Sequence, residues 1–271
     1  LNPITMNNHK FDVVPAKKSK TVAVIGGGVG GIEVARIATL RGHKVTIYEK
    51  SDKLGGVFIA AAQPSFKEKD RMLIEWYRRQ IAKLPIEVKL NTEVKDLSKI
   101  KADVIVVATG AKPKKLNIKG FDKTVEAIEY LNETKTVGDN VAIIGGGLTG
   151  CEIAYDLLLK GKKPFIVEYQ DDIMKVNMLS MANSSYLRDY FNLKNMPIYL
   201  NSSVLEINKD NIVIQNKDGS KKDIKVDSVI SAIGYTPNPL TNKRVKIVGD
   251  ALSVGNLRTV VWRAWEVAEK I

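Results

Sequence analysis

Cysteine is almost absent from this chain of 271 residues, in which Cys151 is the only one. A single cysteine forms no disulfide framework, and with only two histidines the chain lacks a metal site of its own. Long apolar runs are also missing, because the longest, around Val104–Ala108, has the length of a strand rather than the ~20 residues that span a bilayer. The first residues lack the charged and apolar segments of a signal peptide. We therefore expect a reducing cytoplasm and no membrane association.

Acidic residues are fewer than basic ones, since 30 Asp and Glu face 42 Lys and Arg, which gives a net charge of +12. The basic residues are spread along the whole chain, and the densest group is Lys112, Lys114 and Lys115. A basic balance alone predicts solubility and non-specific attraction rather than a binding site. We expect no nucleic-acid partner, and the residues leave open whether the chain forms a homo-oligomer.

Glycine is well represented and marks an internal repeat. Residues 21–54 match residues 140–173 without a gap at an offset of 119, and 15 of the 34 positions are identical. Each copy has the pattern of a βαβ unit: an apolar strand, a glycine-rich turn, an apolar helix and a second strand that ends in glutamate. Two further segments, 102–113 and 227–238, each run from an apolar strand into Ala-x-Gly and a proline. An α/β fold with two Rossmann-like dinucleotide-binding domains is predicted.

Hydrophobic spacing between these segments predicts the remaining elements. Two of them are helices over Phe66–Ala82 and Ser184–Phe191, and a third helix closes the chain over Leu257–Ile271. The predicted strands are Ile86–Leu90, Pro197–Leu200 and a meander of Val204–Ile207, Ile212–Gln215 and Lys222–Val226.

The first glycine turn has the G-x-G-x-x-G spacing, in Gly26, Gly28 and Gly31. In a βαβ unit the first glycine permits a tight turn, the second lets the backbone approach a pyrophosphate, and the third lets helix and strand pack closely. The helix is expected to begin at Ile32, with its free N–H groups facing the anion. Glu49 follows 23 residues after Gly26, where a carboxylate accepts hydrogen bonds from an adenosine ribose.

The second turn repeats this pattern in Gly145, Gly147 and Gly150, with Glu168 again 23 residues after the first glycine. Glu168 disfavours a 2′-phosphate by charge repulsion, and no Lys or Arg follows it until Lys175. We therefore predict NADH rather than NADPH at this site.

Flanking residues distinguish the two sites. Gly55 and Gly56 follow the first copy and allow the backbone to pass close to a bulky cofactor, and the second copy has no such pair. Near the C-terminus, Gly249 and Asp250 end a short strand, where the carboxylate is placed to hold a polyhydroxylated chain such as ribitol. A helix cap or turn acid is the alternative role for Asp250. These features favour FAD at the first site and NADH at the second.

The whole set of motifs, GGGVGG, Glu49, KLGG, ATG, GGGLTG, Glu168, AIGYTPN and VGD, resembles the flavoproteins with two dinucleotide-binding domains. More narrowly, the segment LGGVFIAAAQPSFKEKDRMLIEWYRRQI, the opening Leu1-Asn2-Pro3 and VPAKKSKTVAVIGGG resemble the C-terminal half of the 2-enoate reductase and 2,4-dienoyl-CoA reductase family, which includes the trimethylamine dehydrogenase group. In that family an N-terminal barrel related to old yellow enzyme holds FMN and substrate, and a four-cysteine 4Fe–4S cluster follows it.

The resemblance implies roles for matching positions, none of them catalytic. FAD would be lined by Gly26, Gly28, Gly31, Glu49, Lys50, Gly55, Gly56, Val94, Ala108, Thr109, Gly110, Gly249 and Asp250. NADH would be lined by Gly145, Gly147, Thr149, Gly150, Glu168 and Gly234. In the family, NADH reduces FAD, and electrons pass through the cluster to FMN, which reduces an activated C=C bond. The FAD-binding domain is expected to be discontinuous, residues 1–112 and 239–271, with an NADH-binding domain of residues 113–238 inserted.

The sequence also departs from the family, because it contains neither the barrel nor the cluster cysteines. We therefore expect a C-terminal fragment, the electron-input module, whose partner is its own missing N-terminal FMN barrel and iron–sulfur region. Two alternatives remain open: an electron-transfer subunit like the small subunit of glutamate synthase, and a module that senses NADH without turnover. The segment Val57–Pro64 has no cysteine, which excludes thiol–disulfide chemistry.

Overall fold

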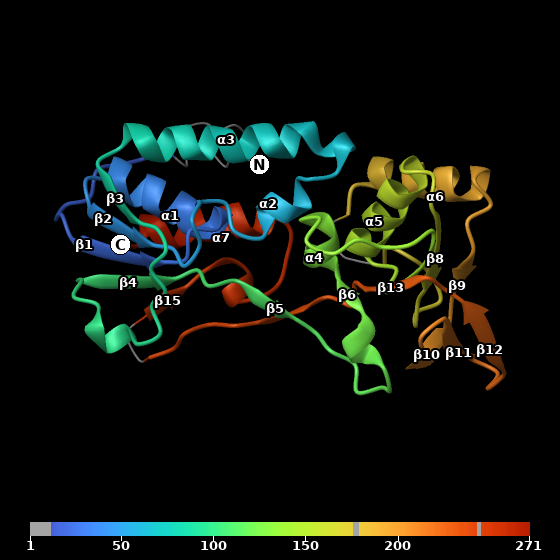
Figure 1. The fold of residues 1–271 in the computed structure, drawn as a ribbon. Helices are drawn as coiled ribbons and strands as arrows, with labels where there is room; N and C mark the ends of the chain where they lie inside the picture. Colours follow the sequence, from blue (N-terminus) through green and yellow to red (C-terminus); the bar gives the residue numbers. More distant parts are fainter. Residues whose placement is uncertain (1–11, 176–178, 243–244) are drawn as a thin grey trace. The chain divides into compact units, whose positions relative to one another are not determined.

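The computed structural model describes residues 12–175, 179–242 and 245–271 (Figure 1). The opening Leu1-Asn2-Pro3, which carries part of the family resemblance, lies outside the described residues. Contacts divide the chain into two compact units. Unit 1 comprises Leu1–Ala62, Phe66–Lys112 and Tyr235–Ile271, and unit 2 comprises Gln63–Ser65 and Pro113–Gly234. Among the helices of the described chain, none combines the length and the apolar character needed to cross a membrane.

Unit 1 is built on a five-stranded parallel sheet in the order β15-β4-β1-β2-β3. Its strands are β1 (Thr21–Ile25), β2 (Lys44–Tyr48), β3 (Ile86–Lys89), β4 (Val104–Val107) and β15 (Val245–Ile247). The edge strand β15 comes from the end of the chain, and its Val245 pairs with Ile105 of β4. The sheet of unit 1 is therefore completed only by residues that follow unit 2 in the sequence.

Three helices cover one face of this sheet: α1 (Val29–Leu40), α3 (Glu68–Lys83) and α7 (Leu257–Glu269) (Figure 1). A short helix, α2 (Phe58–Ala61), precedes α3. The fully buried Trp265 of α7 donates from its indole N–H to the carboxylate of Glu33 on α1 at 2.5 Å, and Arg36 binds the same carboxylate at 2.8 and 2.9 Å. Because a buried carboxylate is costly unless it is paired, this network fixes α7 against α1.

Unit 2 has its own five-stranded parallel sheet, in the order β6-β13-β7-β8-β9. These strands are β6 (Val125–Glu126), β7 (Asn140–Ile144), β8 (Lys163–Val167), β9 (Ile198–Tyr199) and β13 (Ser228–Ser231). The helices of this unit are α4 (Ala127–Leu131), α5 (Leu148–Leu159) and α6 (Met181–Leu193).

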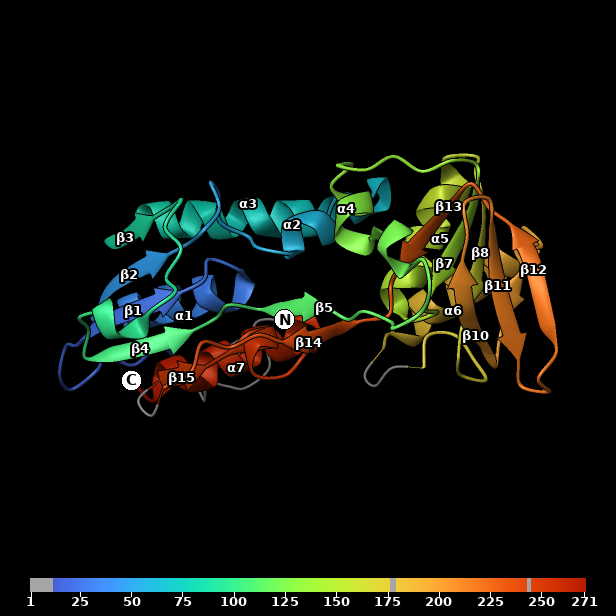
Figure 2. The same cartoon turned by 60° about the horizontal axis from the view of Figure 1, so that its bottom comes forward.

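An antiparallel meander adds a third layer to unit 2 (Figure 2). It consists of β10 (Ser202–Ile207), β11 (Asn211–Asn216) and β12 (Lys221–Lys225). Alternate residues of β11, Ile212 and Ile214, are fully buried against Phe165 and Val167 of the parallel sheet. This alternation is the pattern of a strand with one buried face, as the sequence predicts.

Two short strands, β5 (Ala111–Pro113) and β14 (Tyr235–Pro237), pair where the chain leaves unit 1 and returns to it. Beside them, the backbone N–H of Asn238 donates to the carbonyl of Gly110 at 3.0 Å. The two stretches of chain that follow the two Ala-x-Gly segments are thus hydrogen-bonded to each other.

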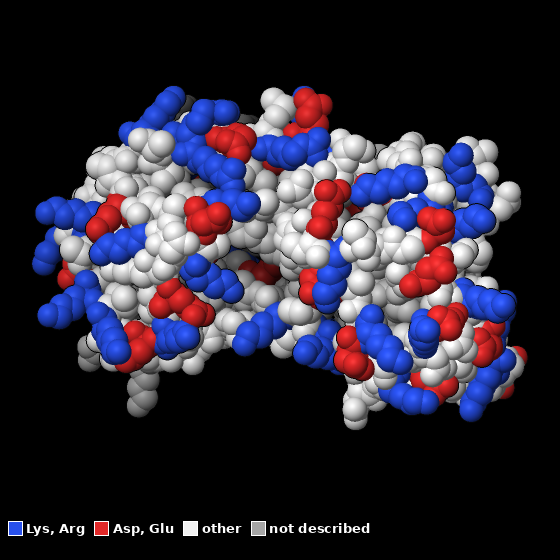
Figure 3. All heavy atoms as spheres, in the orientation of Figure 1, with Lys and Arg blue, Asp and Glu red and all other residues white. Residues whose placement is uncertain are grey.

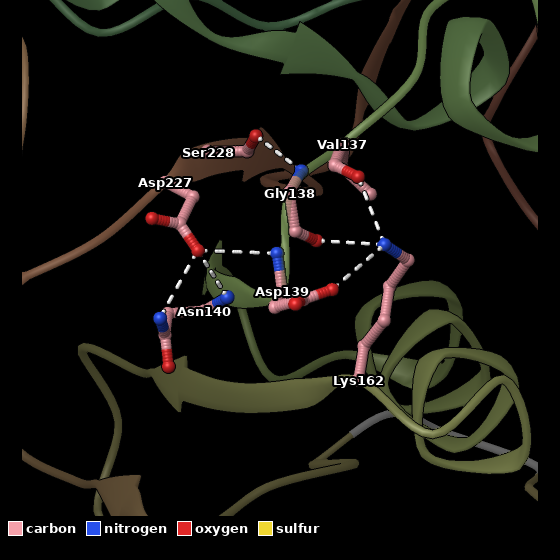
Figure 4. A network of polar contacts seen from close by, with 7 residues as sticks. All are labelled: Val137, Gly138, Asp139, Asn140, Lys162, Asp227 and Ser228. Carbon is pink, nitrogen blue, oxygen red and sulfur yellow. Dashed lines mark hydrogen bonds and ion pairs between the residues drawn. The ribbon is translucent and has the colours of Figure 1, made fainter.

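In both units an aspartate carboxylate accepts hydrogen bonds from the backbone at the start of a neighbouring parallel strand. In unit 2 the carboxylate of Asp227 accepts hydrogen bonds from the N–H groups of Asn140 and Asp139 at 2.7 and 3.1 Å (Figure 4). The bond from Asn140 is the main reason that the pKa of the Asp227 carboxyl lies below its usual range. In unit 1 the carboxylate of Asp103 accepts from the N–H of Thr21 at 2.7 Å. Both aspartates precede the strand that carries Ala-x-Gly.

The position at the end of each repeat helix differs between the units. In unit 2 the ammonium of Lys162 donates to the carbonyls of Val137 and Gly138, both at 2.9 Å (Figure 4). The equivalent position in unit 1 is His43, whose Nδ1 accepts the N–H of Lys20 at 3.2 Å. Burial, followed by the charges of Arg41 and Lys20, lowers the pKa of His43.

Helix α1 begins earlier than the sequence predicts. It starts at Val29 rather than Ile32, so that Gly30 and Gly31 lie in its first turn. Glycine has a low helix propensity, which by itself disfavours an early start. Gly31 packs against the carbonyl oxygen of Gly26 and Gly30 packs against Val260 of α7, and this close packing outweighs their low propensity. Other predicted boundaries differ by a few residues, as for α6, which extends over Met181–Leu193.

Basic and acidic side chains are mixed on the surface. Figure 3 shows Lys and Arg side chains interspersed with Asp and Glu on the visible face of both units. The excess of positive charge does not form one continuous patch on this face.

Candidate dinucleotide sites

The first glycine turn connects β1 to α1 and uses its glycines for three different reasons. Gly26 has a φ of +111°, and a Cβ there would lie 2.4 Å from the carbonyl oxygen of Ala108. A Cβ on Gly31 would lie 2.0 Å from the carbonyl oxygen of Gly26. A Cβ on Gly28 would meet nothing nearer than the Cα of Gly56, at 4.0 Å. Gly26 and Gly31 are therefore required by the fold, whereas the space at Gly28 is open.

The N-terminus of α1 is suited to an anion. Gly28 is its N-cap, with extended backbone and no side-chain hydrogen bond, and the first turn carries no acidic residue. The N–H groups of a first helical turn lack partners within the helix, and the helix dipole adds partial positive charge there. A phosphate can therefore bind at Gly28 without displacing a side-chain cap.

Glu49 has a second role, which the motif does not reveal. Its side chain is buried, and Oε2 accepts the N–H of Gly27 at 2.6 Å. Oε1 accepts both the N–H and the hydroxyl of Ser51, at 2.8 and 2.7 Å. Since a carboxylate accepts about four hydrogen bonds, capacity for about one more remains. Glu49 thus holds the glycine turn, and its bond to a ribose stays a prediction.

The pair Gly55 and Gly56 packs directly on the first glycine turn. The N–H of Gly55 donates to the carbonyl of Gly27 at 2.8 Å, and a Cβ on Gly56 would lie 2.9 Å from the Cα of Gly28. Both glycines have positive φ, at 131° and 57°. The pair therefore lets one backbone segment cross another. The guanidinium of Arg78 donates two hydrogen bonds, at 2.8 and 3.0 Å, to the carbonyl of Leu54, which precedes the pair.

The end of the chain closes over the first turn. A Cβ on Gly30 would lie 3.7 Å from the Cα of Gly249 and 3.2 Å from Val260 of α7. Asp250 follows in a 3₁₀ turn, Gly249–Ala251, and its carboxylate accepts the N–H of Gly255 at 3.1 Å. Burial raises the pKa of Asp250. The structure therefore brings Gly249 and Asp250 to the N-terminal end of α1.

The remaining predicted residues of unit 1 are placed differently from one another. The N–H of Ala108 donates to the carbonyl of Ile25 at 2.8 Å, and the hydroxyl of Thr109 donates to the carbonyl of Asn238 at 2.7 Å. A Cβ on Gly110 would meet no atom within 4 Å. Val94 packs in the apolar cluster on the other face of the sheet, and Lys50 is exposed. Ala108 borders the turn, whereas contacts of Val94 and Lys50 with it are not seen.

The second glycine turn, between β7 and α5, repeats the first. Cβ atoms on Gly145 and Gly150 would lie 2.6 Å from the carbonyl oxygen of Ala232 and 2.0 Å from that of Gly145. A Cβ on Gly147 or Gly234 would meet no atom within 4 Å. Gly147 caps α5 without a side-chain hydrogen bond, and no acidic residue lies in the first turn of this helix. Thr149 is exposed here.

Glu168 matches Glu49 in its bond to the glycine turn. Its buried carboxylate accepts the N–H of Gly146 through Oε2 at 2.5 Å and the N–H of Gln170 through Oε1 at 2.8 Å. Two of its roughly four acceptor positions remain for a ligand. Cys151 lies beneath the turn, fully buried, where burial raises the pKa of its thiol to about 12. Such a thiol is an inert packing group.

The loop after Glu168 contains contacts that the motifs do not reveal. The N–H of Met174 donates to the carbonyl of Gly146 at 2.6 Å, and Ile173 packs against Gly146. The guanidinium of Arg188 on α6 binds both carboxylate oxygens of Asp172, at 2.6 and 2.9 Å. Asp172 and Arg188 are 16 positions apart, so no local pattern reveals this pair, whereas a spacing of four suggests the pair of Asp171 and Lys175.

Fold and turns together define a protein with two dinucleotide-binding units, each with a glycine turn that leads into a helix without a side-chain cap. A family model described as pyridine nucleotide-disulphide oxidoreductase matches residues 6–99 and 87–254. The chain belongs to this family. The predicted α/β class with two Rossmann-like units, the oxidoreductase class, and FAD and NAD(H) as the cofactors are thereby confirmed.

Individual relatives agree with the narrower resemblance. The chain is 37% identical to the cinnamate reductase of Clostridium sporogenes and 30% identical to the NADH oxidase of Thermoanaerobacter brockii, with all of this chain matched in both cases. The match covers 42% and 44% of those proteins, so the chain spans less than half of their length. A solved 2-naphthoyl-CoA reductase matches 96% of this chain and 41% of its own, at 31% identity and a TM-score of 0.88.

Proposed function

We propose that this chain is the electron-input module of an NADH-dependent flavin oxidoreductase, in which unit 1 binds FAD and unit 2 binds NADH. The chemistry that these cofactors supply is hydride transfer from nicotinamide to flavin. From there, electrons would pass to an iron–sulfur cluster and an FMN barrel that reduces an activated C=C bond. Those groups belong to a part of a longer protein outside this chain, in line with the 42% and 44% coverage of its relatives. A cytoplasmic location is part of the proposal.

The observation that carries this proposal is the pair of open glycine turns. At Gly28 and Gly147 the backbone is extended, and the space where a Cβ would stand is free of other atoms to about 4 Å. Each turn is held rigid by a buried glutamate, Glu49 or Glu168. A pyrophosphate therefore meets a preformed cradle of N–H groups in both units.

The surroundings of the two turns support different ligands. In unit 1 the turn is enclosed by Gly56, Gly249 and α7, which suits a tightly held FAD, with Asp250 near the ribityl chain. In unit 2 the equivalent residue, Thr149, is exposed among the residues that the structure describes, which suits an exchanging NADH. We extend the proposal to the residues named from the sequence. For FAD these are Gly26, Gly28, Gly31, Glu49, Lys50, Gly55, Gly56, Val94, Ala108, Thr109, Gly110, Gly249 and Asp250, and for NADH they are Gly145, Gly147, Thr149, Gly150, Glu168 and Gly234.

A spectrum of the protein tests this function. The chain, reconstituted with FAD, should show the flavin absorbance bands, and anaerobic addition of NADH should bleach them. NADPH should bleach them more slowly, because Glu168 repels a 2′-phosphate. A protein that binds NADH but cannot be reconstituted with FAD would instead favour the sensing module.

Two substitutions separate the sites without disturbing the fold. Gly28→Val and Gly147→Val place a side chain in open space at extended backbone angles that any residue adopts. Gly28→Val should abolish FAD retention and leave NADH binding intact, and Gly147→Val should do the reverse. Each variant serves as the control for the other. Loss of both ligands in either variant, with circular dichroism unchanged, would contradict the assignment of one cofactor to each unit.

A further inference from the structure

The two basic side chains that follow Glu168 in the sequence are both bound by aspartates. Lys175 and Arg188 are the first Lys and Arg after Glu168. The ammonium of Lys175 donates to Asp171 at 2.6 Å, and the guanidinium of Arg188 makes a two-bond contact with Asp172. These pairs hold the cations that a 2′-phosphate on the ribose would otherwise recruit.

The loop that carries the aspartates borders the ribose-binding glutamate. A Cβ on Gly146 would lie 2.9 Å from Ile173 and 3.1 Å from the Oε2 atom of Glu168, so both side chains approach the same point. Arg188 also donates to the carbonyl of Ile173 at 2.7 Å. The guanidinium of Arg188 therefore binds the same chain segment, Asp172 and Ile173, that packs beside Glu168.

The first copy of the repeat lacks this arrangement. Asp52 stands at the position of Asp171, but Gly56 stands at the position of its partner Lys175, and Lys53 stands at the position of Asp172. The aspartate pairs are thus a feature of unit 2 alone and are not required by the βαβ turn itself.

We propose that Asp171 and Asp172 are specificity-determining residues: by binding Lys175 and Arg188 they withhold positive charge from a 2′-phosphate and favour the unphosphorylated dinucleotide. This inference rests on the proposed NADH site in unit 2. Glu168 excludes the phosphate by repulsion, and the aspartates remove the attraction that could offset that repulsion. Both aspartates are exposed enough for solvent to weaken the pairs, so a freed cation can reorient toward a ligand.

The test compares two probes on the full chain by isothermal titration at fixed ionic strength. The probes are 5′-ADP and 2′,5′-ADP, and binding lost in Gly147→Val defines the unit 2 site. In the double variant Asp171→Asn, Asp172→Asn the ratio of the two dissociation constants should shift by at least about tenfold toward 2′,5′-ADP. Asp189→Asn, an exposed acid on α6, removes the same kind of charge and should shift the ratio by less than about twofold.

Other outcomes are equally decisive. A double variant that behaves like Asp189→Asn, or that tightens both probes alike, overturns the proposal. If the double variant binds neither probe because the loop is disturbed, the single variant Asp171→Asn is used instead. Its pair with Lys175 is separate from the contacts of Gly146 with Ile173 and Glu168. An unchanged ratio of the two dissociation constants in this single variant overturns the proposal. Failure of the wild-type chain to bind 5′-ADP in unit 2 contradicts the proposed function, and this inference with it.

Discussion

The two copies of the repeat use the same glycine turn but surround it differently. In unit 1, Gly30 is buried beneath Val260 and Gly249, which come from the end of the chain. In unit 2 the equivalent residue, Thr149, is exposed. The turn itself is set by backbone contacts that are nearly identical in the two copies. The repeat therefore encodes the glycine turn, whereas segments outside the repeat determine whether that turn is covered or exposed.

The unit in which a substitution acts can be followed separately. All three tryptophans of the chain, Trp76, Trp262 and Trp265, lie on α3 and α7 of unit 1. Tryptophan fluorescence therefore reports the unfolding of unit 1, while circular dichroism reports both units.

The largest effect is expected at the third glycine of each turn. Gly31→Ala and Gly150→Ala place a Cβ 2.0 Å from a backbone oxygen in both copies. The gain of ~1 kcal/mol in helix propensity is outweighed by displacement of the helix from the strand, so each variant should lose about 2–3 kcal/mol of unfolding free energy. Denaturant unfolding should show the loss by fluorescence only for Gly31→Ala. A loss in one copy alone would show that the turns are not equivalent.

Exchanging the residues at the covered position, Gly30, and the open position, Thr149, tests directly whether the two turns differ in their surroundings. Gly30→Thr forces a side chain against Val260 of α7, where even a Cβ would be 3.2 Å away, and should cost about 1–2 kcal/mol and weaken FAD retention. Thr149→Gly removes an exposed side chain and should cost less than about 1 kcal/mol. Equal losses in the two variants would contradict the enclosure of the first turn. Unfolding is followed by circular dichroism for both variants and also by fluorescence for Gly30→Thr, and retained flavin absorbance is measured alongside.

A smaller difference is expected at the other end of the sheets. Lys162→Met removes the two hydrogen bonds to Val137 and Gly138 and should lower the unfolding free energy of unit 2 by about 1 kcal/mol, without changing fluorescence unfolding. Exposed Lys163→Met is the matched control and should have almost no effect. Equal losses of unfolding free energy in Lys162→Met and Lys163→Met, measured by circular dichroism, would show that the bonds of Lys162 do not stabilise unit 2.

The smallest effect is expected for Asp250→Asn. Because burial raises the pKa of Asp250 in the folded state, its protonated form is favoured by folding, and stability is lost as pH rises from the unfolded pKa through the folded one. Asparagine escapes this loss, so the variant should unfold at slightly higher denaturant than wild type at pH 7, and the two should converge at low pH. FAD affinity should nevertheless fall if Asp250 binds the ribityl chain. A turn acid without a ligand would leave affinity unchanged.

Much of this architecture follows from the sequence because it depends on local features. The two turns, their strands and the meander appear as glycine spacing and as alternation of apolar residues. The early start of α1 is not predicted because Gly30 packs against Val260 and Gly249, which are far away in the sequence. The bonds from Glu49 to Gly27 and from Arg188 to Asp172 join residues 22 and 16 positions apart, and such contacts leave no local pattern.

The edge strand β15 and helix α7 have a consequence for the order in which the protein is made. During synthesis the ribosome releases β1 to β4 first, but the core of unit 1 still lacks Trp265 and the pairing of β15 with β4. All residues of unit 2 precede Tyr235, so that unit can close its own core before β15 and α7 are added. Unit 1 therefore keeps part of its sheet exposed until β15 and α7 have left the ribosome.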